Sequence, residues 1–236
     1  MNKKIKKIAI VIFPICLIAL IDYFNLDNII QETVATSQTI SYDIEQIPEY
    51  NGKYYVIINN NEPNFTDEEK TTTSFEQYSN LDSLGRCGVA YANISIDLMP
   101  TEKRGSIGMI KPSGWHTVKY DNIDGKYLYN RCHLIGYQLT GENANEKNLI
   151  TCTRYMNTVG MLEFENKVAN FIKETNSHVL YRVTPIFNGE DLLARGVQME
   201  ALSVEDNGKG IKFNVFVYNV QDGININYSN GNSSKK

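Results

Sequence analysis

The stretch YNRCHLIGYQLTGENANEKNLITCTRYMN, residues 129–157, decides what unit this chain builds, because an extended segment and a loop lead directly into a helix. The extended segment carries His133. Beyond Asn157, apolar residues recur at spacings of three and four, which predicts an amphipathic helix; they are Val159, Leu162, Phe164, Val168, Phe171 and Ile172. Glu165 follows Asn157 by eight residues, about two helical turns. We therefore expect a histidine, an amide and a carboxylate in one pocket.

The rest of the pattern predicts an α+β fold with a central antiparallel β-sheet flanked by helices. Runs rich in β-branched and aromatic residues predict strands; they are residues 53–60, 88–100, 178–187, 196–205 and 209–220. The segment DNGKG, 206–210, is typical of a turn between the last two. A helix beginning near Thr66 or Ser74 is also compatible with the polar segment 62–86.

The first 25 residues resemble an export segment. Four lysines precede an apolar run from Ile8 to Leu20, as in a signal peptide. The run is short for a membrane span, which needs roughly 20 residues. A cleaved signal and a retained anchor over residues 8–24 therefore both remain open, and either places the protein outside the cell or on the outer face of its membrane. We expect a polar tether over 26–50, a folded domain over 51–225 and a disordered tail over 226–236.

The charge balance excludes binding of a polyanion by bulk charge. The net charge is −4, and the first 25 residues carry +3, which leaves −7 for the remainder. Proteins that bind nucleic acid by bulk charge are basic, so such a contact must be local or assisted by a cation. Three cysteines follow residue 25, without the spacing of a zinc knuckle. The sequence is compatible with buried thiols and with a Cys132–Cys152 disulfide.

The spacing after His133 suits phosphodiester hydrolysis. Asn148 follows at +15, Asn157 at +24 and Glu165 at +32. A neutral imidazole can take a proton from water. A hard divalent cation, held by an amide oxygen and mostly by water, can offset charge on a phosphate. Arg131, two residues before the histidine, can hold the phosphate through its planar fork.

Residues 130–173, NRCHLIGYQLTGENANEKNLITCTRYMNTVGMLEFENKVANFIK, resemble the DNA/RNA non-specific endonucleases of the ββα-metal, or His-Me finger, class. Among these, the likeness is greatest to the streptodornases and DNA-uptake nucleases of streptococci, and it extends over roughly residues 50–220. The resemblance implies a secreted or surface-anchored, monomeric nuclease. It would need Mg²⁺, for which Mn²⁺ can substitute, and would cut DNA, and in some members RNA, with little sequence preference.

The resemblance also assigns roles to individual residues. His133 matches the general base, and Asn157 matches the asparagine that binds magnesium. Asn148 matches an amide that orients the site around the base. Glu165 matches a helix carboxylate, which we expect to hold metal-bound water. Arg131 matches the arginine of the motif, with a catalytic or an organising role.

Two further arginines are candidates for binding the substrate phosphate, with Arg86 preferred and Arg104 as its rival. The family's D-R-G-H motif stands here as Asn130–Arg131–Cys132–His133, so the aspartate and the glycine are replaced. A cysteine would be strained there if the backbone needed a positive φ.

The replacements at Asn130 and Cys132 give some support to a relative that binds nucleic acid or a surface partner without cutting. A cysteine hydrolase, with Cys132 or Cys152 as nucleophile and His133 or His116 as base, is a second alternative. It is disfavoured because adjacent side chains diverge.

Overall fold

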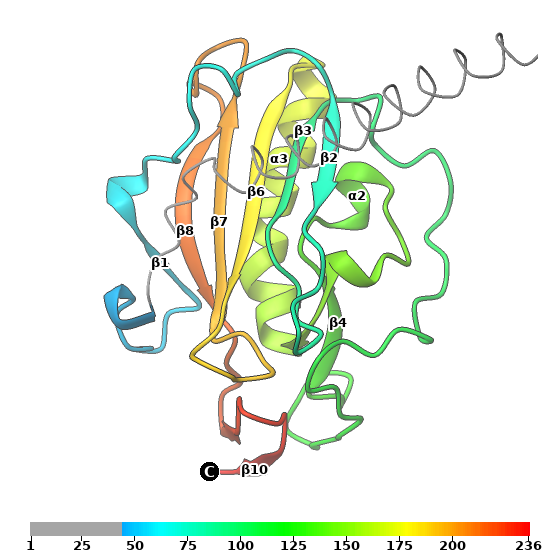
Figure 1. Ribbon diagram of the computed structural model, residues 1–236, viewed down its shortest axis with the longest axis vertical. Coiled ribbons are helices and arrows are strands. Elements are labelled where there is room, and N and C mark those ends of the chain that lie inside the picture. Colours follow the sequence, from blue (N-terminus) through cyan, green and yellow to red (C-terminus); the bar gives the residue numbers. More distant parts are fainter. Residues whose placement is uncertain (1–43) are drawn as a thin grey trace, which may run out of the picture. The chain divides into compact units, whose positions relative to one another are not determined.

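The computed structural model describes residues 44–236. Its main element is a six-stranded antiparallel sheet with the strand order β1-β8-β7-β6-β3-β2, which runs from left to right in Figure 1. The strands are β1 (Tyr55–Ile57), β2 (Phe75–Tyr78), β3 (Ala90–Ile94), β6 (Val179–Ile186), β7 (Gly196–Ser203) and β8 (Lys212–Tyr218). The α+β fold expected from the sequence is confirmed.

Smaller elements surround this sheet. Two antiparallel ribbons lie outside it, β4 (Tyr129–His133) with β5 (Leu149–Thr153), and β9 (Ile224–Ile226) with β10 (Ser233–Lys235). The helices are α2 (Tyr137–Thr140), α3 (Leu162–Thr175), the π-helical turn η4 (Met156–Met161) and the 3₁₀ turns η1 (Ile44–Gln46), η2 (Asn59–Asn61) and η3 (Glu146–Asn148). Within residues 44–236, none of these helices has both the length and the apolar character that crossing a bilayer requires.

Helix α3 covers one face of the sheet (Figure 1). Its buried residues Phe164, Val168 and Ile172 belong to the main core together with alternate residues of β6, β7 and β8. Burying one such side chain contributes about 1.5–3 kcal/mol, so this face fixes the helix. Val159 and Leu162 were expected on the same apolar stripe, but they are 40% and 38% exposed, because the π-helical turn alters the spacing before α3 begins.

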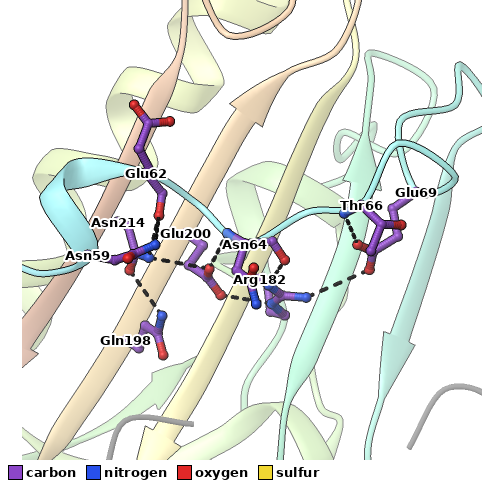
Figure 2. A network of polar contacts seen from close by, with 9 residues as sticks. All are labelled: Asn59, Glu62, Asn64, Thr66, Glu69, Arg182, Gln198, Glu200 and Asn214. Atoms are coloured by element: carbon purple, nitrogen blue, oxygen red, sulfur yellow. Dashed lines mark hydrogen bonds and ion pairs between the residues drawn. The ribbon is translucent and has the colours of Figure 1, made fainter. Parts of the chain in front are cut away.

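The opposite face of the sheet carries a buried polar network (Figure 2). Arg182 on β6 donates to Glu200 on β7 at 2.8 Å and to the Asn64 carbonyl at 2.6 Å. The Asn64 N–H donates to Glu200 at 2.8 Å, and Glu69 lies 3.7 Å from the Arg182 guanidinium. A buried charge is costly unless it is paired and hydrogen-bonded. The pair therefore holds the segment before β2 across the sheet.

Three expectations from the sequence are wrong for this domain. Residues 44–50 are not a free tether, because Ile47 is buried and Tyr218 donates to the Pro48 carbonyl at 2.6 Å. Residues 226–236 are not disordered, because β10 pairs with β9. Inside the domain, no helix begins at Thr66 or Ser74, and Ser74 directly precedes strand β2. The export segment, 1–25, and the expected tether up to residue 43 lie outside the described residues.

Candidate active site

The expected order of extended segment, loop and helix is present. His133 ends β4 and lies opposite Leu149, the first residue of β5, in the two-stranded ribbon. η4 begins three residues after β5 ends and continues directly into α3. His133 on the β4–β5 ribbon, Asn157 in η4 and Glu165 on α3 therefore follow one another along the chain, as in a ββα unit.

Asn148 fixes the backbone that leaves His133. Its Oδ1 accepts from the Ile135 N–H at 2.9 Å, and its Nδ2 donates to the Ile135 carbonyl at 3.0 Å. The Leu134 N–H donates to the Asn148 carbonyl at 2.9 Å. Asn148 is fully buried, so it touches neither solvent nor substrate. Its contacts hold the turn after β4 and thereby the direction of the histidine side chain.

His133 is held as a neutral imidazole with one defined tautomer. Its Nε2 lies 2.7 Å from the carbonyl oxygen of Asn143, which can only accept, so Nε2 carries the proton and Nδ1 keeps its lone pair. Arg104 Nη2 donates to this lone pair at 3.3 Å. Burial lowers the pKa of His133 to about 4, and the charge of Arg104 acts in the same direction, although the bond to Asn143 opposes it. At neutral pH, Nδ1 is therefore unprotonated, and it can accept a proton once Arg104 turns away from it.

Glu165 reaches from α3 to the turn after His133. A Cβ on Gly136 would lie 2.5 Å from the Glu165 carboxylate, so the approach of helix and turn requires a glycine. Burial raises the pKa of Glu165 to about 7, while Gln138 and the positive charge of Arg104 oppose this rise. Arg104 therefore contacts the imidazole directly, and its charge also acts on the carboxylate.

Asn157 is the residue best suited to hold a cation. It lies half-buried in η4, and its side chain makes no hydrogen bond with any residue in 44–236. An amide oxygen without a protein partner fits a hard divalent cation, which takes oxygen ligands. In the same range no three His, Cys, Asp or Glu side chains cluster as a metal site. A cation at Asn157 would thus keep mostly water ligands.

Arg131 is committed to the backbone of the preceding loop. Its guanidinium donates to the carbonyl oxygens of Gly108, at 2.9 Å, and of Ile110, and it stacks on Trp115 at 3.9 Å from the ring centroid. Burial lowers its pKa. These contacts support the organising role that was one of its two expected roles.

Arg86 is likewise engaged in structural contacts. It donates to Asp82 at 2.7 Å, to the carbonyls of Gly189 and Asp191 at 2.7 and 3.0 Å, and it stacks on Phe187. None of these partners belongs to the site around His133. The structure thus brings Arg104, and not Arg86, to the histidine.

Cys132 and Cys152 form a disulfide that joins β4 and β5, with their Cα atoms 5.8 Å apart. Cys132 is not among the positive-φ residues of 44–236, so this position needs no glycine. The neighbouring Asn130 makes no side-chain hydrogen bond with residues 44–236.

The disulfide leaves Cys87 as the free thiol of residues 44–236. It donates to the carbonyls of Glu146 and Leu149, and burial raises its pKa to about 12. A cysteine nucleophile is therefore excluded among these residues. His116, the other proposed base, bonds to the Asn230 carbonyl near the C-terminus at 2.8 Å.

Two contributors to the site were not expected from the sequence. Asn143 acts through its backbone carbonyl, for which no residue type gives a signal. Gly136 provides the space for Glu165, and its position three residues after His133 is a signal that could have been used. Burial raises the pKa of Tyr181 on β6, and the charge of Glu165 adds to this rise.

The fold and the site define a class of protein, in which a β-ribbon ends on a buried histidine and is followed by a helical segment that carries an amide in η4 and a carboxylate in α3. A family model described as DNA/RNA non-specific endonuclease matches residues 63–205. The match covers more than half of the chain, which therefore belongs to the DNA/RNA non-specific endonuclease family.

Individual relatives agree with this assignment. A deoxyribonuclease of Streptococcus dysgalactiae subsp. equisimilis is 29% identical in an alignment that covers 70% of this chain. The chain spans 62% of the length of that relative.

Solved structures are similar over most of the chain. NucA from Streptococcus agalactiae with magnesium bound has a TM-score of 0.67 at 26% identity and covers 76% of this chain and 86% of its own. NucA without metal has a TM-score of 0.71 at 26% identity, over 86% and 99%. The Sda1 nuclease with bound zinc has a TM-score of 0.62 at 28% identity, over 83% and 100%.

Proposed function

We propose that this protein is a divalent-metal-dependent endonuclease that hydrolyses DNA without sequence preference, with His133 as general base. The observation that carries the proposal is the state of the imidazole. Burial keeps it neutral, the Asn143 carbonyl fixes the proton on Nε2, and Nδ1 keeps a lone pair beside Arg104. Water activation requires such a group, namely an unprotonated base held in one orientation.

The other residues of the site position the substrate and the base. His133 Nδ1 takes the proton of the attacking water, and the bond from Nε2 to Asn143 stabilises the imidazolium that results. Arg104 is exposed and donates to Nδ1. When its guanidinium turns to the oxygens of the scissile phosphate, the lone pair of Nδ1 becomes free for the attacking water. Asn148 keeps the turn rigid, which preserves the direction of attack.

Asn157 would hold the cation, and Glu165 would orient water bound to it. We expect Mg²⁺, with Mn²⁺ as a substitute. When bound, the cation offsets negative charge on the phosphate and the leaving oxygen. The family likeness supports products with 5′-phosphate and 3′-hydroxyl ends.

The substrate is DNA and can include RNA, recognised through backbone phosphates rather than base edges. We propose that the protein is exported and acts outside the cell as a monomer, free or held at the membrane through residues 8–24. The disulfide supports this location, because such bonds persist in oxidising compartments. The mass of the mature N-terminus distinguishes cleavage from anchoring.

The proposal is tested by incubating the purified full chain with supercoiled plasmid in Mg²⁺, in EDTA, and in EDTA followed by excess Mg²⁺. We expect nicking and degradation in the first and third reactions only. Equal cutting in all three would refute the metal requirement. Retention of the plasmid on the protein without nicking in Mg²⁺ would instead favour the non-catalytic relative, for which the unpartnered Asn130 is the specific observation.

A further inference from the structure

The loop of residues 101–113, here called the basic loop, is fastened to the active-site unit along its length. At its start, the Tyr137 hydroxyl of α2 donates to the Glu102 carbonyl at 2.8 Å. At its end, Thr151 of β5 donates to the Ser113 carbonyl at 2.8 Å. The loop has no helix or strand of its own, so these contacts give it its conformation.

Met109 lies in the middle of the basic loop, between two residues whose carbonyls are held by one arginine. Arg131 of β4 donates to the carbonyls on both sides of it, Gly108 and Ile110, and the guanidinium is stacked on Trp115. The side chain of Met109 is nevertheless 69% exposed, more than any other large apolar side chain of residues 44–236. A single exposed apolar residue is ordinary, but one whose backbone is clamped on both sides by a strand of the active site is presented to solvent in a fixed position.

The charges of the basic loop are opposite in sign to those of the chain. Lys103, Arg104 and Lys111 against Glu102 give the loop a net charge of +2, in a chain whose net charge is −4. All three basic residues are exposed, and Arg104 contacts His133. Basic residues therefore stand on both sides of Met109 in sequence, and one of them, Arg104, contacts the proposed general base.

We propose that Met109 is a substrate-binding residue that inserts into the minor groove of duplex DNA next to the scissile phosphate. The inference rests on the proposed nuclease function and adds the contact that holds the duplex. Apolar side chains, methionine among them, enter the minor groove and wedge against base steps in proteins that bind DNA by shape. Such a contact does not read the base sequence, which agrees with a nuclease that positions the duplex mainly through its phosphates.

The test compares Met109→Ala, Met109→Gln and Met109→Leu with Ile57→Ala, which removes another exposed apolar side chain on the edge strand β1. For duplex DNA, we expect KM to rise about tenfold in the alanine and glutamine variants, by loss of one apolar contact, with kcat kept within about twofold. The leucine variant and Ile57→Ala should match the wild type. Thymidine 5′-(p-nitrophenyl phosphate), a mononucleotide without a groove, should be cut equally by all five proteins.

A wild-type KM for duplex DNA in both Met109→Ala and Met109→Gln would overturn the inference, as would equal losses in all three Met109 variants. If the wild type cuts neither substrate, the proposed nuclease function fails instead. Fluorescence anisotropy with a labelled duplex in EDTA then still tests Met109: Kd should rise about tenfold in Met109→Ala, and an unchanged Kd would refute the contact.

Discussion

Replacement of Glu165 by glutamine should stabilise the metal-free protein, and increasingly so as the pH rises. Burial raises the pKa of Glu165 from 4.5 to about 7. Between these values the unfolded chain has lost the proton and the folded chain keeps it, so the free energy of unfolding falls as the pH rises through this window and stays low above it. Glutamine has no such proton, so the Glu165→Gln variant lacks this loss.

The size of the effect follows from the shift. At about pH 8 the full difference applies, which at about 1.4 kcal/mol per pKa unit is about 3 kcal/mol. At about pH 5 most of the loss has not yet occurred, and the same relation gives about 1 kcal/mol. The stability of the variant relative to the wild type should therefore be about 2 kcal/mol greater at the higher pH.

The assay is urea denaturation in EDTA at both pH values, followed by circular dichroism. Glu163→Gln, on the same helix, is the matched control. Hydrogen bonds from Lys167 and Tyr54 lower the pKa of Glu163, so this variant should lose stability or stay constant relative to the wild type as the pH rises. A difference for Glu165→Gln that is flat between the two pH values, or that follows the Glu163 control, would refute the desolvation of this carboxylate.

Three further predictions concern the arginines, the buried amide and the disulfide. Arg104→Ala should lower kcat/KM for plasmid DNA about tenfold or more without changing the melting temperature. Arg86→Ala should instead lower the free energy of unfolding by about 1–3 kcal/mol without changing kcat/KM. Steady-state kinetics and thermal denaturation of both variants test this, and an exchange of the two effects would contradict it. Asn148→Ala should lower the free energy of unfolding by about 2–4 kcal/mol in urea, because it leaves two buried backbone groups of Ile135 without partners, and a wild-type midpoint would argue against that role. Reduction of the disulfide should lower the free energy of unfolding by about 3 kcal/mol for a sequence separation of 20 residues, and identical melting curves with and without reductant would count against its formation.

The long strands and the main helix could be predicted because their periodicity reports burial directly. β6, β7 and β8 are rich in β-branched and aromatic residues, and the turn at residues 206–210 has Asn207 and Gly208 at positive φ, as that segment predicts. The limits of the domain could not be predicted in the same way. Residues 44–50 form only the C-terminal end of a largely polar segment, and it is the contacts of Ile47 and Pro48 with the sheet that reveal that they belong to the fold.

The site was predictable where side chains act and hidden where the backbone acts. The spacing of His133, Asn157 and Glu165 led to one ββα unit, because a helix keeps residues at known distances. The partner of Nε2 is a carbonyl of Asn143, which any residue type could supply. The choice between Arg86 and Arg104 depended on tertiary contacts with segments far away in the sequence, which no local pattern contains.

The central claim is that His133 supplies the base for phosphodiester hydrolysis, and it is tested most directly by the kcat of His133→Ala on plasmid DNA in Mg²⁺. His116→Ala serves as the control, since that histidine also bonds to a backbone carbonyl, but its partner is Asn230 near the C-terminus. The account predicts a loss of about 10²–10⁴-fold for His133→Ala, with an unchanged melting temperature or a higher one, and wild-type activity for His116→Ala. Wild-type kcat in a folded His133→Ala variant would contradict the account.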